Sequence, residues 1–317
     1  MNRIAGVPEA LVSEARTEGK AWALREIPAG RGNPLAVAGK RLDDLIKWRR
    51  TYSQADIVHV HYATNGYYGW GNKPFVLHLH GSDVRQDWQK PGLRQVITHS
   101  LKRADAVICA TPDLVPWVQD IRPDATWIPN PVPAEFLDSS NVQPRDKRII
   151  FSSRWDNTKG LDLLLPLARI LVERGFEVVG VDWGSDSERA AELGVKLAPL
   201  MSLPTFRDFL ASGQVVVGQF QFPAFSTTDY QTLALNRPLV AAANAENAPV
   251  HTVATGDYPG LKREPERLAD HIVELMNESS WENTRDWVIK NHHPAHCVSL
   301  VEEIYKQVLE SGVKNES

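Results

Sequence analysis

The chain has 317 residues, 43% of them hydrophobic, which is enough for two ordinary domains with separate cores. Its formal net charge of −4 excludes a general attraction to nucleic acid. Its two cysteines exclude a disulfide scaffold and favour a reducing cytoplasm. No apolar run reaches the length of a transmembrane helix and the N-terminus has no signal-peptide pattern, so we expect a cytoplasmic protein.

Short apolar segments alternate with helical patterns in the first part of the chain. The predicted strands are 55–62, 75–80, 106–110 and 125–128, and the clearest helical patterns are 9–19 and 91–104. This alternation is typical of βαβ units, in which the strands of the sheet are parallel.

A polar stretch with a proline, residues 138–147, has the composition of a linker and separates this series from a second one. The second series has predicted strands at 148–153, 177–182, 214–220 and 238–243, and residues 266–317 look helical with a polar break near 277–282. We therefore expect an α/β protein of two Rossmann-like domains that face each other across a ligand cleft. We place the domains at 1–140 and 141–280, followed by a helical segment at 281–317.

The segment 151–162, FSSRWDNTKGLD, combines a strand end, a turn and a helix start. Arg154 follows the predicted strand, and Lys159 precedes the predicted helix 161–173. Two cations that converge on a helix N-terminus form a receptor for a diphosphate. Such a pair on a surface is commonly just solvated, but ligands of open α/β sheets bind at the carboxyl ends of strands, which favours the phosphate site.

Two predicted strands of the first domain carry histidines in alternate positions. His59 and His61 belong to one strand, and His78 and His80 to the next. No carboxylate or cysteine partner completes a metal site, so we expect no metal. A histidine at a strand end is commonly bonded to backbone, although His80 could instead bond a substrate hydroxyl.

Residues 40–50, KRLDDLIKWRR, form a basic amphipathic helical pattern. Such a helix could lie on an anionic membrane, at the inner face of the cell membrane. A solvated helix face is the competing interpretation, and Asp43 and Asp44 favour it because they interrupt the positive charge.

These motifs together resemble family 4 glycosyltransferases, which are retaining enzymes with the GT-B fold. Arg154 and Lys159 have the spacing of the pair that binds the donor diphosphate in that family. The resemblance extends to 56–61 (DIVHVH), 78–83 (HLHGSD), 128–132 (IPNPV) and 238–241 (PLVA), and so covers most of the chain.

The resemblance implies roles for further residues. His80 becomes the catalytic candidate of the N-terminal domain, and Gly6 and Asp83 fall on the acceptor side. Segment 281–317 would cross back to the N-terminal domain. The backbone amides expected to add to the diphosphate site are those of Ser226, Thr227 and Thr228.

The chain departs from the family at its signature pair of glutamates. Aligned on Pro238, those positions hold Pro223 and Gln231. Pro223 has no polar side-chain atom, so Asp229 is the expected substitute among the catalytic residues. The amide oxygen of Gln231 could accept a hydrogen bond from a ribose hydroxyl.

A second departure lies at the N-terminus. The family opens with an apolar strand, a glycine loop and a helix, whereas this chain opens with a loop and the predicted helix 9–19. The first strand is therefore missing from the expected sheet. Either the recorded start is too late or the domain is rearranged, and Gly6 is then either a ligand-approaching glycine or an ordinary turn glycine.

The leading hypothesis is a retaining glycosyltransferase of hexosyltransferase type in glycan biosynthesis, which uses a nucleotide-diphosphate sugar and neither a metal nor another cofactor. Its acceptor would be a glycan, a lipid-linked sugar or a small molecule. The alternative is a non-catalytic GT-B protein that binds a nucleotide sugar or a partner protein. A sugar-nucleotide epimerase is a third interpretation.

Overall fold

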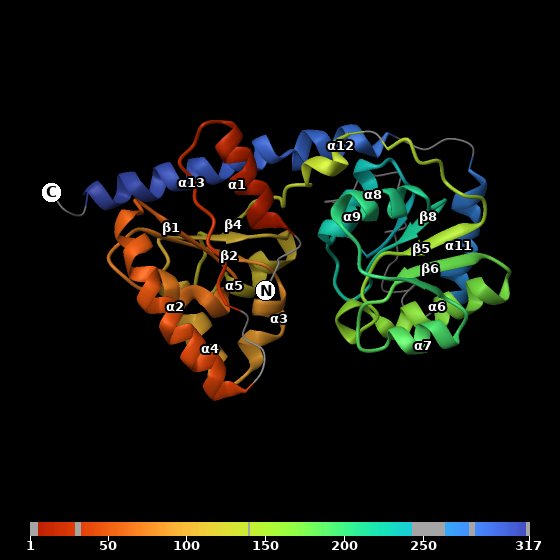
Figure 1. Ribbon diagram of the computed structural model, residues 1–317, viewed down its shortest axis with the longest axis horizontal. Helices are drawn as coiled ribbons and strands as arrows, with labels where there is room; N and C mark the ends of the chain where they lie inside the picture. The colour runs from red at the N-terminus through yellow and green to blue at the C-terminus, as the bar shows by residue number, and fades with distance from the viewer. Residues whose placement is uncertain (1–5, 29–32, 139, 243–263, 279–282, 315–317) are drawn as a thin grey trace. The chain divides into compact units, whose positions relative to one another are not determined.

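The computed structural model describes residues 6–28, 33–138, 140–242, 264–278 and 283–314 (Figure 1). Two compact units divide the chain, the first comprising 1–131 and 294–317 and the second 132–293. The first unit therefore ends at Pro131 rather than at residue 140, and the chain returns to it at Pro294 rather than at residue 281. None of the helices in the described ranges combines the length and apolar content that crossing a membrane requires.

The first unit contains a sheet of four parallel strands in the order β1-β2-β3-β4. The strands are β1 (Val58–His61), β2 (Phe75–Leu79), β3 (Ala106–Cys109) and β4 (Thr126–Trp127). The helices are α1 (Val7–Thr17), α2 (Pro34–Gln54), α3 (Ser82–Arg85), α4 (Leu93–Arg103), α5 (Val115–Val118) and α13 (Pro294–Lys314). All four strands fall within the ranges predicted from the apolar runs.

Helices cover both faces of this sheet. Because side chains alternate along a strand, Val60 of β1 joins a core with Trp48 of α2 and Ile97 of α4. Val76 of β2 belongs to the other face and packs with Val301 of α13. Figure 1 shows α13 (blue) on the side of the sheet opposite α2 and α4. The C-terminal helix is thus part of the core of the first unit.

No strand precedes β1 in the described part of the first unit, so β1 is the edge of its sheet. The N–H groups of Val58 and Tyr62 donate to the carbonyls of Pro74 and His78 on the β2 side, both at 2.8 Å. Because backbone N–H groups alternate in direction along a strand, those of His59 and His61 point away from β2, toward the open edge. The first strand that the family leads us to expect is not among the described residues.

The second unit has a sheet of five parallel strands in the order β7-β6-β5-β8-β9. The strands are β5 (Arg148–Phe151), β6 (Glu177–Val181), β7 (Lys196–Ala198), β8 (Val215–Val217) and β9 (Leu239–Val240). The helices are α6 (Leu161–Glu173), α7 (Ser187–Glu192), α8 (Leu203–Ala211), α9 (Thr227–Ala234), α11 (Pro265–Asn277) and α12 (Thr284–His292). Only β7, a three-residue edge strand, has no counterpart among the predicted strands.

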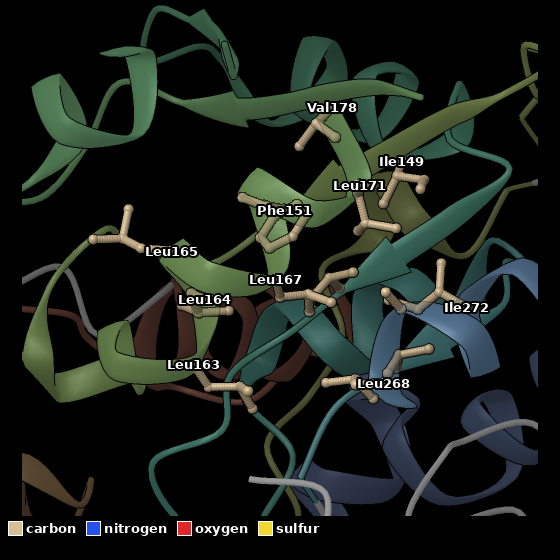
Figure 2. Packing of buried hydrophobic residues seen from close by; sticks show 14 of the residues in the cluster. Ile149, Phe151, Leu163, Leu164, Leu165, Leu167, Leu171, Val178, Leu268 and Ile272 are labelled. Carbon is tan, nitrogen blue, oxygen red and sulfur yellow. The ribbon is translucent and has the colours of Figure 1, made fainter. Parts of the chain in front are cut away.

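Consecutive residues of β5 serve opposite faces of this second sheet. Phe151 packs with Leu167 of α6 and Leu268 of α11, as Figure 2 shows. Ile150 points to the other face and packs with Leu233 of α9. These two fully buried layers explain why the strands read as continuous apolar runs. The predicted α/β architecture of two Rossmann-like units is confirmed, while the cleft expected between them stays a prediction.

The entry into α6 depends on Gly160. This residue has φ +87°, in the left-handed region, and an added Cβ would lie 3.1 Å from the backbone carbonyl carbon of Phe220. The N–H of Phe220 in turn donates to the carbonyl of Lys159 at 3.0 Å. The turn after β5 is therefore held directly against the turn after β8, and only glycine leaves room for this approach.

Replacing Gly160 by alanine should destabilise the second unit more than the matched change Gly175→Ala. Both glycines have positive φ, but an added Cβ at Gly175 meets nothing within 4 Å. The control should therefore cost only the left-handed backbone term of roughly 1–2 kcal/mol, and Gly160→Ala should add a steric cost of about 1 kcal/mol or more. Urea unfolding would measure both, and equal midpoints for the two variants would contradict the close packing at Gly160.

Candidate functional site

The carboxyl edge of the second sheet brings the predicted diphosphate residues onto neighbouring segments. β5 and β8 are adjacent and parallel, so the chain leaves both at the same edge. After β5 it passes through the 3₁₀ turn η5 (Asn157–Lys159) into α6, and after β8 it runs through 218–226 into α9. Two helix N-termini therefore begin on neighbouring segments of this edge, which is the usual ligand position of open α/β sheets.

Arg154 is held in place by its own turn and by a surface tryptophan. Its Nη2 donates to Thr158 Oγ1 at 3.0 Å, and its Nε lies 3.5 Å from a carboxylate oxygen of Asp156. The guanidinium carbon lies 5.1 Å from the centre of the Trp183 ring, which is a cation–π distance. The side chain still keeps 33% of its surface exposed, so it is oriented and remains accessible.

The backbone that carries Arg154 is anchored by Trp155. This side chain is fully buried and stacks on Phe151 with ring centres 5.3 Å apart. The backbone N–H of Trp155 donates to the carbonyl of Trp183 at 2.8 Å, and its backbone carbonyl accepts from the N–H of Asp186 at 3.0 Å. Neither tryptophan is among the residues that the sequence predicts, although Trp183 directly follows a predicted strand, where ligand-facing residues of this fold are found.

Lys159 links the turn after β5 to the neighbouring segment. Its Nζ lies 5.4 Å from the centre of the Phe222 ring, and its carbonyl accepts the N–H of Phe220. Its positive charge also acts on Asp229, at the start of α9. Lys159 and the start of α9 therefore lie close together, as the predicted diphosphate site requires.

The start of α9 is closed by a capping box. Ser226 Oγ accepts from the N–H of Asp229 at 3.3 Å, and Asp229 Oδ2 accepts from the N–H of Ser226 at 2.6 Å. The N–H of Ser226 and the carboxylate of Asp229, which the sequence analysis assigns to donor binding and catalysis, thus form hydrogen bonds that cap the helix. The first-turn N–H groups of Thr227 and Thr228 have no intrahelical acceptor, because a helix start leaves them unpaired.

Asp229 is buried in this helix cap. Its side chain is 0% exposed, and its Oδ1 is buried with no hydrogen-bond partner among the described residues. Burial raises the pKa of Asp229 to about 6, while hydrogen bonds from Ser226 and the charge of Lys159 act in the opposite direction. Asp229 is therefore a buried capping residue, and its role as a substitute for the missing glutamate stays a prediction.

Two glutamines lie near this cap, and sequence reasoning selected only one of them. Gln231 is 4% exposed, and its contact with a ribose stays a prediction. Gln219 is fully buried, and its amide donates to the carbonyls of Phe222 and Ala224 at 2.7 and 2.6 Å. Its Oε1 accepts from the N–H of Gln221 at 2.8 Å. Gln219 thus shapes the loop that contains Pro223.

In the first unit, Asp83 has a structural role, and its predicted place on the acceptor side stays a prediction. It is 0% exposed, and its carboxylate accepts N–H groups of Ala63 at 2.9 Å, His80 at 3.1 Å and Val84 at 3.0 Å. These bonds fasten the turn after β2 to the segment after β1. Gly6 has φ +76° and precedes α1, and an added Cβ there would meet nothing within 4 Å. Its predicted acceptor role stays a prediction.

The four histidines form a stack on one face of β1 and β2. His61 Nδ1 lies 2.9 Å from His80 Nε2, and the rings of His61 and His78 stack with centres 4.8 Å apart. Burial lowers the pKa of His59 to about 3, and burial with the neighbouring imidazoles lowers the pKa of His61, His78 and His80 well below the usual value. The rings are therefore neutral and can stack without repulsion.

Nitrogen atoms of His59, His61 and His78 lie within 4.8 Å of one another, which is close enough to raise the question of a metal. The planes of neighbouring rings differ by only 11° to 27° across these three residues. An ion must lie in the plane of each imidazole that binds it, and parallel planes stacked above one another share no such point. The arrangement favours stacking over chelation.

A cavity of about 1030 Å³ lies along β1 in the first unit. Residues 20–28 and 54–61 form much of its wall, together with side chains of α1 and α13 such as Leu11 and Tyr305. It follows the edge of β1 that has no neighbouring strand in the described chain. The cavity is therefore space beside a strand edge that has no partner strand in the described chain, and none of its lining residues belongs to the predicted diphosphate site.

Asp229→Asn should flatten the pH dependence of stability. The folded-state pKa of about 6 lies above the ordinary value of 3.8, so the folded state binds the proton more tightly. The wild-type free energy of unfolding should therefore fall as pH rises from about 4 to about 6. An asparagine has no charge to bury, so the variant should gain up to about 3 kcal/mol on the wild type over this window. Urea unfolding of both proteins at about pH 4 and about pH 7 measures this gain. A stability difference between variant and wild type that is the same at both pH values would contradict the prediction.

Comparisons with known protein sequences and solved structures show which proteins this chain resembles. Residues 13–136 match the sequence profile of Glycosyltransferase Family 4, and no curated protein sequence matches the chain. Sucrose-phosphate synthase from Thermosynechococcus elongatus has a TM-score of 0.67 at 17% identity, over 92% of this chain and 82% of its own. HepE from Anabaena, in complex with UDP and glucose, has a TM-score of 0.66 at 14% identity, over 93% of this chain and 88% of its own. A glycosyltransferase from Rickettsia africae has a TM-score of 0.57 at 16% identity, over 94% of this chain and 87% of its own.

The structural likenesses show the fold, and the sequence profile shows the relationship over residues 13–136. Both agree with the resemblance read from the Arg154/Lys159 pair and the strand motifs. Residues 13–136 therefore match Glycosyltransferase Family 4, and the chain has the GT-B fold of these solved structures.

Proposed function

We propose that the protein transfers a hexose from a nucleotide-diphosphate sugar to a glycan, a lipid-linked sugar or a small molecule, with retention of configuration. The observation that carries the proposal is the pair Arg154 and Lys159 at the carboxyl edge of the second sheet. The complex of HepE with UDP and glucose supports the same class of donor.

The pair suits a leaving diphosphate on physical grounds. Arg154 offers a forked donor that Trp183 and Thr158 already orient, and Lys159 offers a compact point charge. The unpaired N–H groups at the start of α9 add fixed partial charge at no reorganisation cost. These groups neutralise the charge that builds on the diphosphate, so the proposed transfer requires no metal.

We further propose His80 as the catalytic residue of the first unit. This residue directly follows β2 and is the catalytic candidate of the N-terminal domain. His80 is half-buried, and its neutral imidazole can donate or accept a hydrogen bond but carries no charge. A contact with a sugar hydroxyl or with the reacting centre would position the hexose for attack by the acceptor.

Arg154→Ala should remove most of the stabilisation that a nucleotide donor gives to the protein. Charge-assisted bonds of this kind contribute about 1.5–3 kcal/mol, so the dissociation constant should rise roughly 10- to 150-fold. Thermal-shift titrations with UDP, GDP, ADP and their sugars would measure the change, because a ligand that binds only the folded state raises the melting temperature.

The matched control for this experiment is Arg169→Ala, on the exposed surface of α6. Arg169 keeps 56% of its side chain exposed and lies 3.9 Å from a carboxylate oxygen of Glu173. The control should bind the donor as the wild type does. A wild-type protein that responds to none of these nucleotides, or an Arg154 variant that responds in full, would overturn the diphosphate site.

A second candidate function is donor binding without turnover. Pro223 and Gln231 stand where the family has its glutamates, and the nearby Asp229 is buried in a helix cap. Within the described residues of this region, no exposed carboxylate replaces the missing pair. Binding alone would keep Arg154 and Lys159, so their presence does not separate the two candidates.

Turnover in the presence of acceptors separates an enzyme from a binding protein. We expect release of nucleoside diphosphate together with a glycosylated product, and we expect His80→Ala to reduce this rate about 100-fold or more while donor-induced stabilisation remains. His99→Ala, at an exposed histidine of the same unit, is the control. Donor binding without any product would favour the non-catalytic alternative, and nucleoside diphosphate released without an acceptor product would point to an epimerase.

A further inference from the structure

Helix α2 has two apolar faces, and only one of them is covered. On the inner face, Trp48 and Tyr52 pack into the core of the first unit. On the outer face, Leu35 is 83% exposed, Leu42 is 62% exposed and Ile46 is 63% exposed. Single exposed leucines are ordinary on protein surfaces, but three on one helix require an account.

The three exposed residues form a continuous stripe. They stand at positions i, i+7 and i+11, and at 100° per residue these positions point in nearly the same direction from the helix axis. The residue between them on the same side, Gly39, has no side chain to interrupt the stripe. The stripe therefore runs along about three turns of the outer face.

Positive charge flanks this stripe on both sides. The exposed Arg49 and Arg50 project to either side of its C-terminal end, while the exposed Lys40 and Lys47 stand more than about 90° round the helix from it. Asp43 is the one exposed acid of α2, and it is paired with Lys47 at 2.7 Å. The outer face is thus apolar along its centre, with an arginine on each side at its C-terminal end.

The second acid of the helix is turned inward. Asp44 is buried and accepts bonds from Arg25 Nη2 at 2.7 Å and from the hydroxyl of Tyr68 at 2.7 Å. In the sequence, Asp43 and Asp44 together interrupt the positive charge and favour a merely solvated helix. Because Asp44 points inward in the structure, only Asp43 remains as an exposed negative charge on this helix.

We propose that the outer face of α2 binds an anionic membrane surface, with Leu35, Leu42 and Ile46 inserted at the level of the lipid headgroups. An apolar stripe with an arginine on each side matches this boundary, where acyl chains meet anionic phosphates. Apolar burial and charge attraction would then act on the same helix face.

This binding is independent of glycosyl transfer, since it involves neither Arg154 nor His80. Where the proposed function holds, it also selects among the acceptor classes, because a helix seated on lipid holds the first unit next to membrane-embedded substrates. The lipid-linked acceptor is then the favoured class, and this last step rests on the proposed function.

Co-sedimentation of the full chain with lipid vesicles tests the proposal. We expect binding to vesicles of mixed phosphatidylcholine and phosphatidylglycerol, with weaker binding as salt increases, and little binding to phosphatidylcholine alone. Arg49→Gln with Arg50→Gln should weaken binding about 30-fold, since each cation near an anionic surface contributes a roughly sixfold effect. Leu42→Ser with Ile46→Ser should weaken it by about tenfold or more.

The matched controls lie in the second unit. Leu200→Ser with Leu203→Ser removes two leucines that are 67% and 39% exposed. Arg169→Gln with Arg189→Gln removes two arginines with more than half of their side chains exposed. All of these are surface changes, and circular dichroism with the nucleotide thermal shift would verify folding independently. Both control pairs should bind vesicles as the wild type does.

Three outcomes would overturn the proposal. The first is no binding of the wild type to anionic vesicles, and the second is equal loss in the control pairs. The third is self-association of the wild type in light scattering that disappears in the Leu42/Ile46 variant without any vesicle binding, which would assign the stripe to a second copy of the chain. Donor binding that survives any of these results would leave the proposed function standing.

Discussion

The hydrogen bond from the N–H of Phe220 to the carbonyl of Lys159 joins the two turns on which the candidate site is built. One turn carries Arg154 and Lys159, and the other leads to Gln219 and the start of α9. Gly160 makes the contact possible, because a side chain there would meet the backbone of Phe220. The candidate site therefore forms where two strand ends approach each other closely. This backbone contact determines where its charged side chains lie.

The sequence is most informative where a pattern has a single structural meaning. The apolar runs of β5 and β8 predict parallel buried strands, and Gly160 followed by an apolar helix predicts the turn after β5. Arg154 and Lys159 could be found because they stand at such a junction. β7 has only the residues Lys196–Ala198 and lies at the sheet edge, where no two-sided burial leaves a recognisable run.

The site residues were harder to predict because polar side chains have several uses. Ser226 and Asp229 have the serine and acid spacing of a capping box, and this local signal describes them better than the comparison with missing glutamates does. Asp83 similarly follows a strand end, yet its oxygens are used by three backbone N–H groups. Gln219 gave no signal, since its importance comes from a loop conformation that only the folded unit defines.

The buried Oδ1 of Asp229 has a consequence for how the donor would be held. A diphosphate bound beside Lys159 brings negative charge toward a carboxyl group that titrates near neutrality. The bound anion would favour the protonated carboxyl, so the complex would take up a fraction of a proton from solution. A nucleotide sugar has no phosphate group that titrates in this range. The affinity for a nucleotide sugar would therefore rise as the solution becomes mildly acidic. Calorimetry in buffers of different ionisation enthalpy would measure the proton that Asp229 takes up on binding.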